Sequence, residues 1–178
     1  CKWIYLLHKW RNVYMIDPTG LQDLPDMVQL ALMACDKPPK ALAIELKCSI
    51  SAVYQSLQGT RTLPASAMRK FAKLNLIASS AMAMQATGFK KLFKYRKSDR
   101  HIQARLVELK IFDKRADEAM NMLPELLFDK NSPKDLTDED RKVILNAVSA
   151  MMDRDNVALN LFMELDNKYK LDLVNKMR

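Results

Sequence analysis

Apolar residues recur every three or four positions along most of this chain, and this spacing constrains the fold more than any other feature. It is clearest in one run of seven apolar positions: Ile102, Leu106, Leu109, Phe112, Ala116, Met120 and Leu123. Such a period puts one apolar stripe along an α-helix, whereas a half-buried strand would need alternation. Only 3 Gly and 7 Pro interrupt the 178 residues, so the composition also favours helix. We therefore expect an all-α protein.

Residues 21–76 contain the clearest helix boundaries. A first helix is expected over residues 25–35 and a second over residues 40–46. Between them stand Asp36, Lys37 and two prolines; Asp36 or Lys37 would cap the second helix, and the prolines fit its first turn, where a missing N–H costs nothing. The inward face of the second helix would be Leu42, Ala43 and Leu46, and the small Ala43 allows close approach of a crossing helix.

A third helix comes after the short connection Lys47-Cys48. Ser49 is placed to cap it, Val53 and Leu57 would form its buried side, and Gly59 ends it. A fourth helix from Pro64 would close the small core with Met68, Phe71, Ala72 and Leu74. A helix, a turn of about three residues and a second short helix packed across the first is the arrangement that reads DNA.

The run from Pro39 to Gly59, together with the next residues Thr60-Arg61-Thr62-Leu63-Pro64, resembles the helix-turn-helix of phage repressor and Cro proteins and the wider xenobiotic-response-element family. The matching features are Ala43, Cys48 in the turn, Ser49, Val53 and Gly59. Lys47 departs from the pattern, since this turn position is usually Gly. Residues 77–88 are similar to the segment after this domain in small prophage regulators. A helix pair without any DNA-binding role can show the same spacing.

The resemblance assigns base reading to the outward face of the third helix: Ile50, Ser51, Tyr54 and Gln55. Gln55 can pair with adenine and Ile50 can pack on a thymine methyl, and with no Arg or Lys on this face an A·T-rich site is expected. Phosphate contacts are expected from residues at helix starts and in the loop after the third helix: Lys40, Lys47, Ser49, Thr60, Arg61 and Thr62. Lys40 and Lys47 could equally be solvated surface.

The net charge of +8 is unevenly distributed. Residues 89–115 hold ten basic and three acidic residues, whereas residues 116–178 hold nine basic and thirteen acidic. A basic front and an acidic tail suit a protein that meets a polyanion with its N-terminal part and protein with its C-terminal part. Within residues 90–100 the charges alternate with Phe93 and Tyr95, which could hold phosphates and stack on bases, or form the exposed face of a linker helix.

The C-terminal half is expected to be helical. The helix over residues 102–123 would end near Pro124 and could pair with its twin in a second subunit or pack within its own chain. After a turn-rich joint at residues 131–135, Thr137 and Asp140 would open another helix that breaks at residues 153–155. A last helix or helix pair would carry the remaining apolar positions: Val157, Leu161, Phe162, Leu165, Tyr169, Leu173 and Met177.

Nothing in the sequence indicates an enzyme, a cofactor or a metal site. His8 and His101 are isolated, there is no glycine-rich phosphate loop, and no set of His, Cys and carboxylates has ligand spacing. The odd number of cysteines favours a reducing compartment, and we expect the cytoplasm. The apolar start of the chain is too short for a signal peptide or a membrane span.

These features predict a sequence-specific regulator that binds double-stranded DNA as a homodimer and is associated with a phage or mobile element. The alternative is a phage-encoded inhibitor that binds a host protein and has an accessory helix-turn-helix. Four regions are expected: an extension over residues 1–20, the helix-turn-helix domain over 21–76, connecting helices over 77–130, and a C-terminal helical region over 131–178 for oligomerisation or partner binding.

Overall fold

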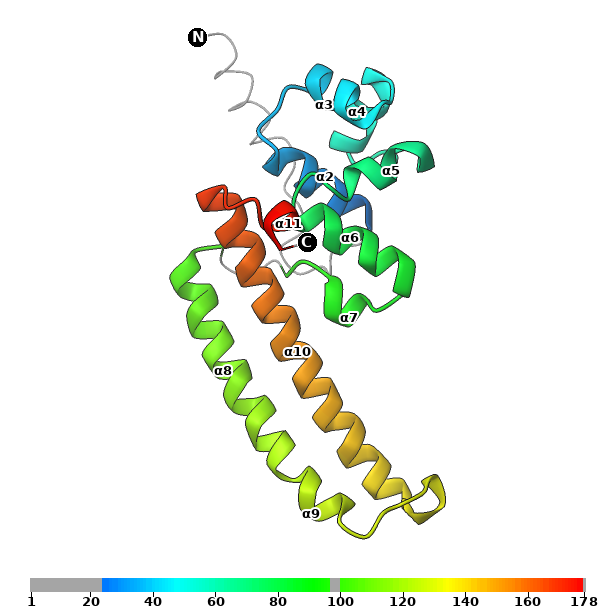
Figure 1. Ribbon diagram of the computed structural model, residues 1–178, viewed down its shortest axis with the longest axis vertical. Coiled ribbons are helices and arrows are strands. Elements are labelled where there is room, and N and C mark those ends of the chain that lie inside the picture. Colours follow the sequence, from blue (N-terminus) through cyan, green and yellow to red (C-terminus); the bar gives the residue numbers. More distant parts are fainter. Residues whose placement is uncertain (1–23, 97–99, 178) are drawn as a thin grey trace.

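A computed structural model describes residues 24–96 and 100–177, and within these ranges the chain is all-helical, without strands. Two parts are visible in Figure 1: a head of short helices, residues 24–96, and a hairpin of long helices, residues 102–169. The all-α fold expected from the sequence is confirmed. The predicted extension over residues 1–20 lies outside the described residues.

The first four helices of the head follow the predicted boundaries within one or two residues. They are α2 (Leu24–Ala34), α3 (Pro39–Leu46), α4 (Ile50–Leu57) and α5 (Ala65–Phe71). The local signals act as expected: Ser49 Oγ accepts a hydrogen bond from the Ala52 N–H at 3.1 Å, and Gly59 adopts φ +69° after α4. The predicted cap of α3, Asp36 or Lys37, was wrong. Pro38 is the N-cap of α3 and makes no side-chain bond, and Asp36 instead adopts a left-handed φ of 55° just after α2.

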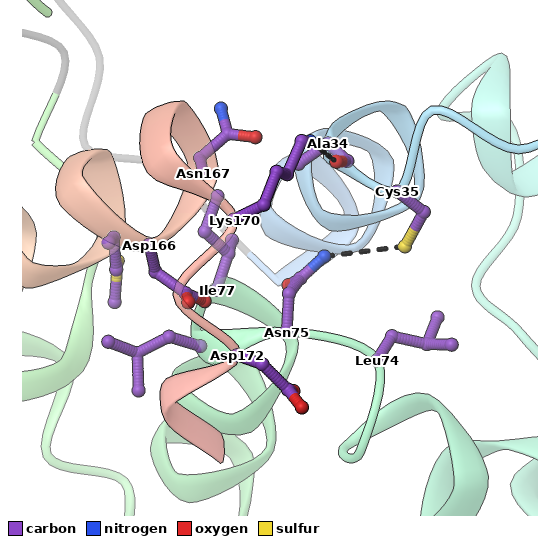
Figure 2. A pocket seen from close by; sticks show the side chains of 11 residues that line it. Ala34, Cys35, Leu74, Asn75, Ile77, Asp166, Asn167, Lys170 and Asp172 are labelled. Atoms are coloured by element: carbon purple, nitrogen blue, oxygen red, sulfur yellow. Dashed lines mark hydrogen bonds between the residues drawn. The ribbon is translucent and has the colours of Figure 1, made fainter. Parts of the chain in front are cut away.

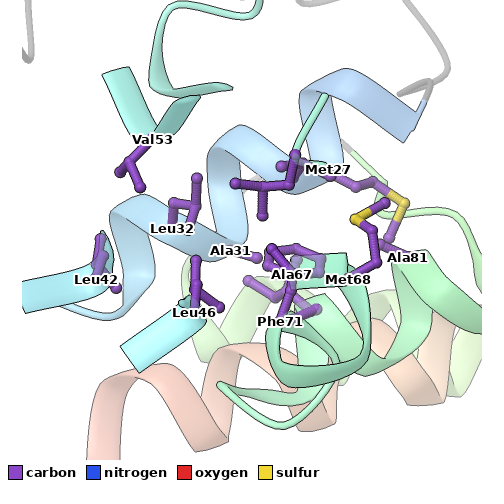
Figure 3. Close-up of a cluster of buried hydrophobic side chains, with 14 of the residues drawn as sticks. Met27, Ala31, Leu32, Leu42, Leu46, Val53, Ala67, Met68, Phe71 and Ala81 are labelled. Carbon is purple, nitrogen blue, oxygen red and sulfur yellow. The ribbon is translucent and has the colours of Figure 1, made fainter. Parts of the chain in front are cut away.

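The core of the head continues past residue 76, where the sequence suggested a boundary. Figure 3 shows Ala31, Leu46, Ala67 and Phe71 pointing toward one another, all of them buried. The next helix, α6 (Leu76–Thr87), packs along α2 and adds further buried side chains to the same cluster: Ile77, Ala78, Ala81 and Met84. A chain ending at residue 76 would therefore expose one side of α2. The head ends with α7 (Lys90–Phe93) and an extended stretch to residue 96.

The hairpin consists of α8 (Ile102–Asn121) and α10 (Asp138–Tyr169), which lie side by side in Figure 1. The predicted long helix thus packs within its own chain. Three short elements complete this part: α9 (Leu123–Leu127), the 3₁₀ turn η1 (Pro133–Asp135) and α11 (Leu173–Lys176). The predicted start of α10 is confirmed, because Thr137 and Asp140 form a reciprocal capping box.

The predicted break at residues 153–155 is wrong, since α10 runs without interruption for 32 residues. Asp is only a few tenths of a kcal/mol less favourable in a helix than average residues. Here its carboxylates also have partners: Arg154 pairs with Asp155 at 2.7 Å, and Lys91 of α7 reaches Asp153 at 3.2 Å. One local pair, Arg154–Asp155, and one tertiary pair, Lys91–Asp153, therefore outweigh the small local preference.

The apolar stripe predicted for α8 is only partly buried. Ala116 is fully buried, whereas Leu106 and Met120 are exposed. The position before Leu106 is a fully buried charge, Arg105, whose guanidinium donates to the Arg96 carbonyl at 2.6 Å and pairs with Glu108 at 3.2 Å. A charged side chain thus occupies a place that spacing alone reserves for an apolar one.

Candidate nucleic-acid interface

The turn between α3 and α4 forms although it lacks glycine. Lys47 adopts φ 53° and ψ 49°, the left-handed conformation that this position requires. The Cys48 N–H donates to the Ala43 carbonyl at 3.0 Å and closes the end of α3. The next residue, Ser49, has extended backbone and starts α4 immediately, so α4 packs across α3. The sequence departure at Lys47 therefore leaves the turn intact.

The four predicted base-reading residues lie on one side of α4, opposite its buried side. Val53 and Ser56 face the core. Ser51 is exposed, Ile50 and Tyr54 are 44% and 41% exposed, and Gln55 is half-buried. Two large apolar side chains left in water on so short a helix are a feature that a ligand surface would explain better than a solvated one.

The predicted phosphate-binding residues surround this face but differ in what they can donate. Lys40, Lys47 and Arg61 are exposed and form no ion pair with any described residue. Ser49 Oγ accepts from the Ala52 N–H, which leaves its own proton free for a phosphate.

Thr60 is the exception, because its hydroxyl donates to the Gln55 carbonyl at 3.0 Å and holds the loop on the end of α4. Its hydroxyl proton is therefore already engaged. Thr62 is half-buried and has no side-chain hydrogen bond to a described residue.

The charges of α4 and of the segment that follows it are of one sign. Residues 46–98 contain no Asp or Glu, and Glu45, the acid nearest in sequence, is held by Lys37 at 2.6 Å. The pKa of Lys70, on α5, is lowered by partial desolvation and by the neighbouring Lys47, so two ammonium groups lie close together. Sequence reasoning missed Lys70, whose proximity to Lys47 depends on how α5 packs against α3.

The described part of the basic segment at residues 90–100 points inward and meets carboxylates of the hairpin. Tyr95 is buried and its hydroxyl donates to Glu164, which Arg100 also contacts at 3.1 Å. Arg96 pairs with Glu108 at 3.5 Å. Burial and the bond to Glu164 raise the pKa of Tyr95 to about 12. The ring of Tyr95 is therefore not available to stack on a base, and these residues join the head to the hairpin.

Two asparagines of α10 complete this joint. The Asn156 amide donates to the Leu92 and Lys94 carbonyls, each at 2.8 Å, and Asn160 accepts from the Arg96 N–H at 2.7 Å. These bonds satisfy backbone groups at and after the end of α7 that have no helical partner.

Gln29 is a further residue that sequence reasoning missed. It is a buried polar side chain of α2, and its Nε2 donates to the Leu57 carbonyl at the end of α4, at 2.7 Å. This bond joins residues 28 positions apart and fixes the end of α4 against α2. A polar residue inside the apolar run Met27-Val28-Gln29 was the only signal.

A cavity of about 170 Å³ lies where the ends of α2, α6 and α10 meet (Figure 2). Four of its polar side chains are hydrogen-bonded to the protein: Asn75, Asp166, Lys170 and Asp172. Asn75 donates to the Ala31 carbonyl and to Cys35 Sγ and caps α6, and Asp166 accepts from the Leu173 N–H at 3.1 Å. Burial raises the pKa of the Cys35 thiol to about 11, which opposes formation of a nucleophilic thiolate.

Comparison of the chain with models of known families, with curated proteins and with solved structures finds no match. Over residues 24–96 and 100–177, no group of three or more His, Cys, Asp or Glu side chains is placed to hold a metal ion. None of the helices in these ranges combines the length and apolar character needed to cross a membrane.

Proposed function

We propose that this protein is a sequence-specific regulator that binds double-stranded DNA through α4, in the manner of the phage repressor and Cro proteins that its sequence resembles. The observation that carries this proposal is the outer face of α4, with Ile50, Tyr54 and Gln55, beside Lys40, Lys47 and Arg61, which form no ion pair with a described residue. An exposed reading helix with unpaired cations around it suits a duplex, because phosphate contacts position the helix and base contacts specify the site.

Each group on the face has a role in this proposal. Gln55 pairs with an adenine edge, Ile50 contacts a thymine methyl, and Ser51 donates or accepts at either base. Lys40, Lys47 and Arg61 contact phosphates, and Lys70 adds charge beside Lys47. The protein acts in the cytoplasm, as a homodimer on a two-fold operator, and belongs to a phage or mobile element.

Selection of binding sites from random duplex DNA, followed by salt titration, tests the proposal. We expect an A·T-rich consensus and an affinity that falls steeply with salt. Gln55→Ala should cost roughly 1–3 kcal/mol and relax one position of each half-site, whereas Arg61→Ala should weaken all sequences alike and reduce the salt slope by about one. Gln85→Ala, at an exposed glutamine of α6, is the matched control. No enrichment of any sequence, at low salt as well, would contradict the proposal.

A second candidate function rests on the far end of the hairpin. Phe128 is 91% exposed there, beside the exposed Leu127 and Met122. A cluster of large apolar side chains in water, far from the head in Figure 1, suits the binding of another protein. In this alternative the chain inhibits a host protein and the helix-turn-helix is accessory. Capture of a partner that is insensitive to salt and abolished by Phe128→Glu, without any selected DNA site, would favour it.

A further inference from the structure

One face of α10 carries residues at alternating intervals of three and four, all of them apolar except Asp155. This seam comprises Leu145, Val148, Met152, Asp155, Leu159 and Phe162. Leu145 and Phe162 are 66% and 48% exposed, Val148 is also exposed, and Met152 and Leu159 are half-buried. An apolar repeat of three and four is the pattern by which one helix packs along another over several turns.

Most of the seam lies between the two faces of α10 that already have partners, and Leu159 at its edge also packs against the core of the head. In Figure 1, α8 runs along one side of α10, and α6 and α7 lie on the other. Ala147 and Leu161 belong to the buried side shared with α8, and Asn156, Asn160 and Met163 point to the head. With 100° between successive residues, the seam falls between these directions. A further helix can therefore lie along α10 without displacing its neighbours.

We propose that the occupant of this seam is α10 of a second copy, in parallel orientation. A heptad repeat is complementary to itself, so an identical helix offers knobs at the spacing of its own holes. The parallel orientation rests on the proposed function: it brings both α4 helices to the same end of the pair, as a two-fold operator requires, whereas an antiparallel pair would separate them by the length of α10, about 48 Å.

The exposed area fits a dimer of modest strength. Fully covered aromatic side chains bury about 150–250 Å², and Leu, Val and Met are smaller. The partly exposed side chains of the seam therefore leave on the order of 300–400 Å² per copy to cover, so two copies together fall in the range of weak interfaces, below about 1,200 Å².

Asp155 supplies a polar position in the middle of the seam. Its carboxylate pairs with Arg154 of the same chain at 2.7 Å, so two copies can bring their Asp155 residues together with both charges compensated. In two-stranded coiled coils an Asn or Lys at a single a position of the seam fixes the register at a cost in stability. Asp155, at a d position of this seam, would restrict the register in the same way, because only in-register copies place the two carboxylates beside their Arg154 partners.

Sedimentation equilibrium of the full chain tests the seam. We expect a dimer at tens of micromolar, and Phe162→Glu should weaken it roughly 100-fold because two charges would meet in the interface. The matched control is Val107→Glu, at an exposed apolar residue of α8 outside the seam, which should change the dissociation constant less than about threefold. Asp155→Val should tighten the dimer instead, so the test does not depend on one variant remaining folded.

Cross-linking tests the orientation. In a parallel pair, Val148→Cys places two thiols in one layer, within the Cα separation of about 4.4–6.8 Å that a disulfide needs. In an antiparallel pair centred on Asp155, the two positions would lie about 20 Å apart. We expect oxidised Val148→Cys to give a covalent dimer. Oxidised Val107→Cys is the control, because any covalent dimer of this variant forms outside the seam, for example through the native cysteines.

The outcomes separate this inference from the proposed function. A full chain that is monomeric at 100 μM, or a dimer that responds to Val107→Glu and not to Phe162→Glu, overturns the seam. A dimer with no Val148→Cys cross-link overturns its parallel orientation. A monomer that still selects a DNA sequence through Gln55 leaves the proposed function standing, and a seam dimer that selects none leaves the inference standing while the function fails.

Discussion

The head and the hairpin are both helical, but they are stabilised differently. In the head, helices of seven to twelve residues bury side chains from every direction around Phe71 and Ala31. In the hairpin, helices of 20 and 32 residues bury few: α8 contributes Ile102, Arg105 and Ala116. The buried residues of α10 cluster over residues 156–166, beside the head, and only Ala147 is buried in its first eighteen residues. Long helices thus do not imply a large core.

The basic residues of the two regions also differ in whether they have ion-pair partners. Lys40, Lys47 and Arg61 on the head form no ion pair with described residues, whereas Arg96, Arg100 and Arg105 at the joint are all matched by carboxylates. Of these six basic residues, only Lys40, Lys47 and Arg61 are free of ion pairs with described residues.

The largest effect should separate two residues of the same type. Phe71→Ala in the head should lower the free energy of unfolding by about 3–5 kcal/mol, because a fully buried ring leaves a cavity. Phe128→Ala at the far end of the hairpin should change it by less than about 0.5 kcal/mol, because that ring is already in water. Urea denaturation followed by circular dichroism measures both. Equal losses would mean that the two regions share one core.

The joint between the regions should respond to alkaline pH. The pKa of Tyr95 is raised from 10 to about 12, so the folded state holds its proton more tightly than the unfolded state. The contribution of this raised pKa to the free energy of unfolding is complete below pH 10 and is lost as the pH rises from 10 to 12. A pKa difference of two units corresponds to about 2–3 kcal/mol. Thermal unfolding between pH 9 and 12 should therefore be flatter for Tyr95→Phe than for the native chain. Tyr169→Phe, at an exposed tyrosine, should leave the slope unchanged.

A smaller effect should result from loss of the bond that holds α4. Gln29→Leu keeps the size of the side chain but leaves the Leu57 carbonyl without its partner, at a cost of about 1 kcal/mol in stability. If this bond positions the reading helix, specific DNA affinity should fall by more than non-specific affinity in gel-shift titrations. The control Gln85→Leu, on the exposed side of α6, should alter neither the stability nor the DNA affinity. If Gln29→Leu lowers the affinity for all DNA sequences alike, Gln29 only stabilises the fold and does not position the reading helix.

The smallest effect compares the same substitution in both regions. Lys47 and Lys170 end α3 and α10 in the left-handed conformation, with φ 53° and 52°. Glycine would relieve about 1 kcal/mol of strain and lose part of it to the more flexible unfolded chain, so each change should stabilise by about 0.5 kcal/mol. Only Lys47→Gly should also weaken DNA binding, since it removes a charge beside α4. Equal binding by both variants would exclude a phosphate contact at Lys47.

The sequence predicts the head better than the hairpin because, in the head, single residues with local effects mark the helix ends. Pro39, Ser49 and Gly59 act on their own helix ends, and the predicted boundaries of α3 and α4 are confirmed. The base-reading and phosphate roles assigned to these helices stay predictions. Residues 153–155 were interpreted as a break because a helix interior with two Asp residues looks unfavourable from the sequence alone, and the tertiary partner of Asp153 is Lys91, 62 residues earlier.

The inward direction of the basic segment could not be predicted from the sequence for the same reason. Tyr95 and Arg100 meet Glu164, more than 60 residues later in the chain. The pattern of basic and aromatic residues is the same whether the segment faces a nucleic acid or a buried carboxylate, and only the tertiary fold decides between them.

The continuity of α10 has a mechanical consequence. The second half of α10 is fixed to the head through Asn156, Asn160 and Met163, and Lys91 contacts Asp153 just before them. The rest of the first half projects beyond these contacts. A tilt of about ten degrees at Asn156 would carry the start of α10, about 27 Å away, through about 5 Å. In the reverse direction, a force applied near Phe128 exerts a torque on the joint that grows with the length of the projecting part. A partner bound at the far end of the hairpin could therefore tilt the hairpin relative to the head.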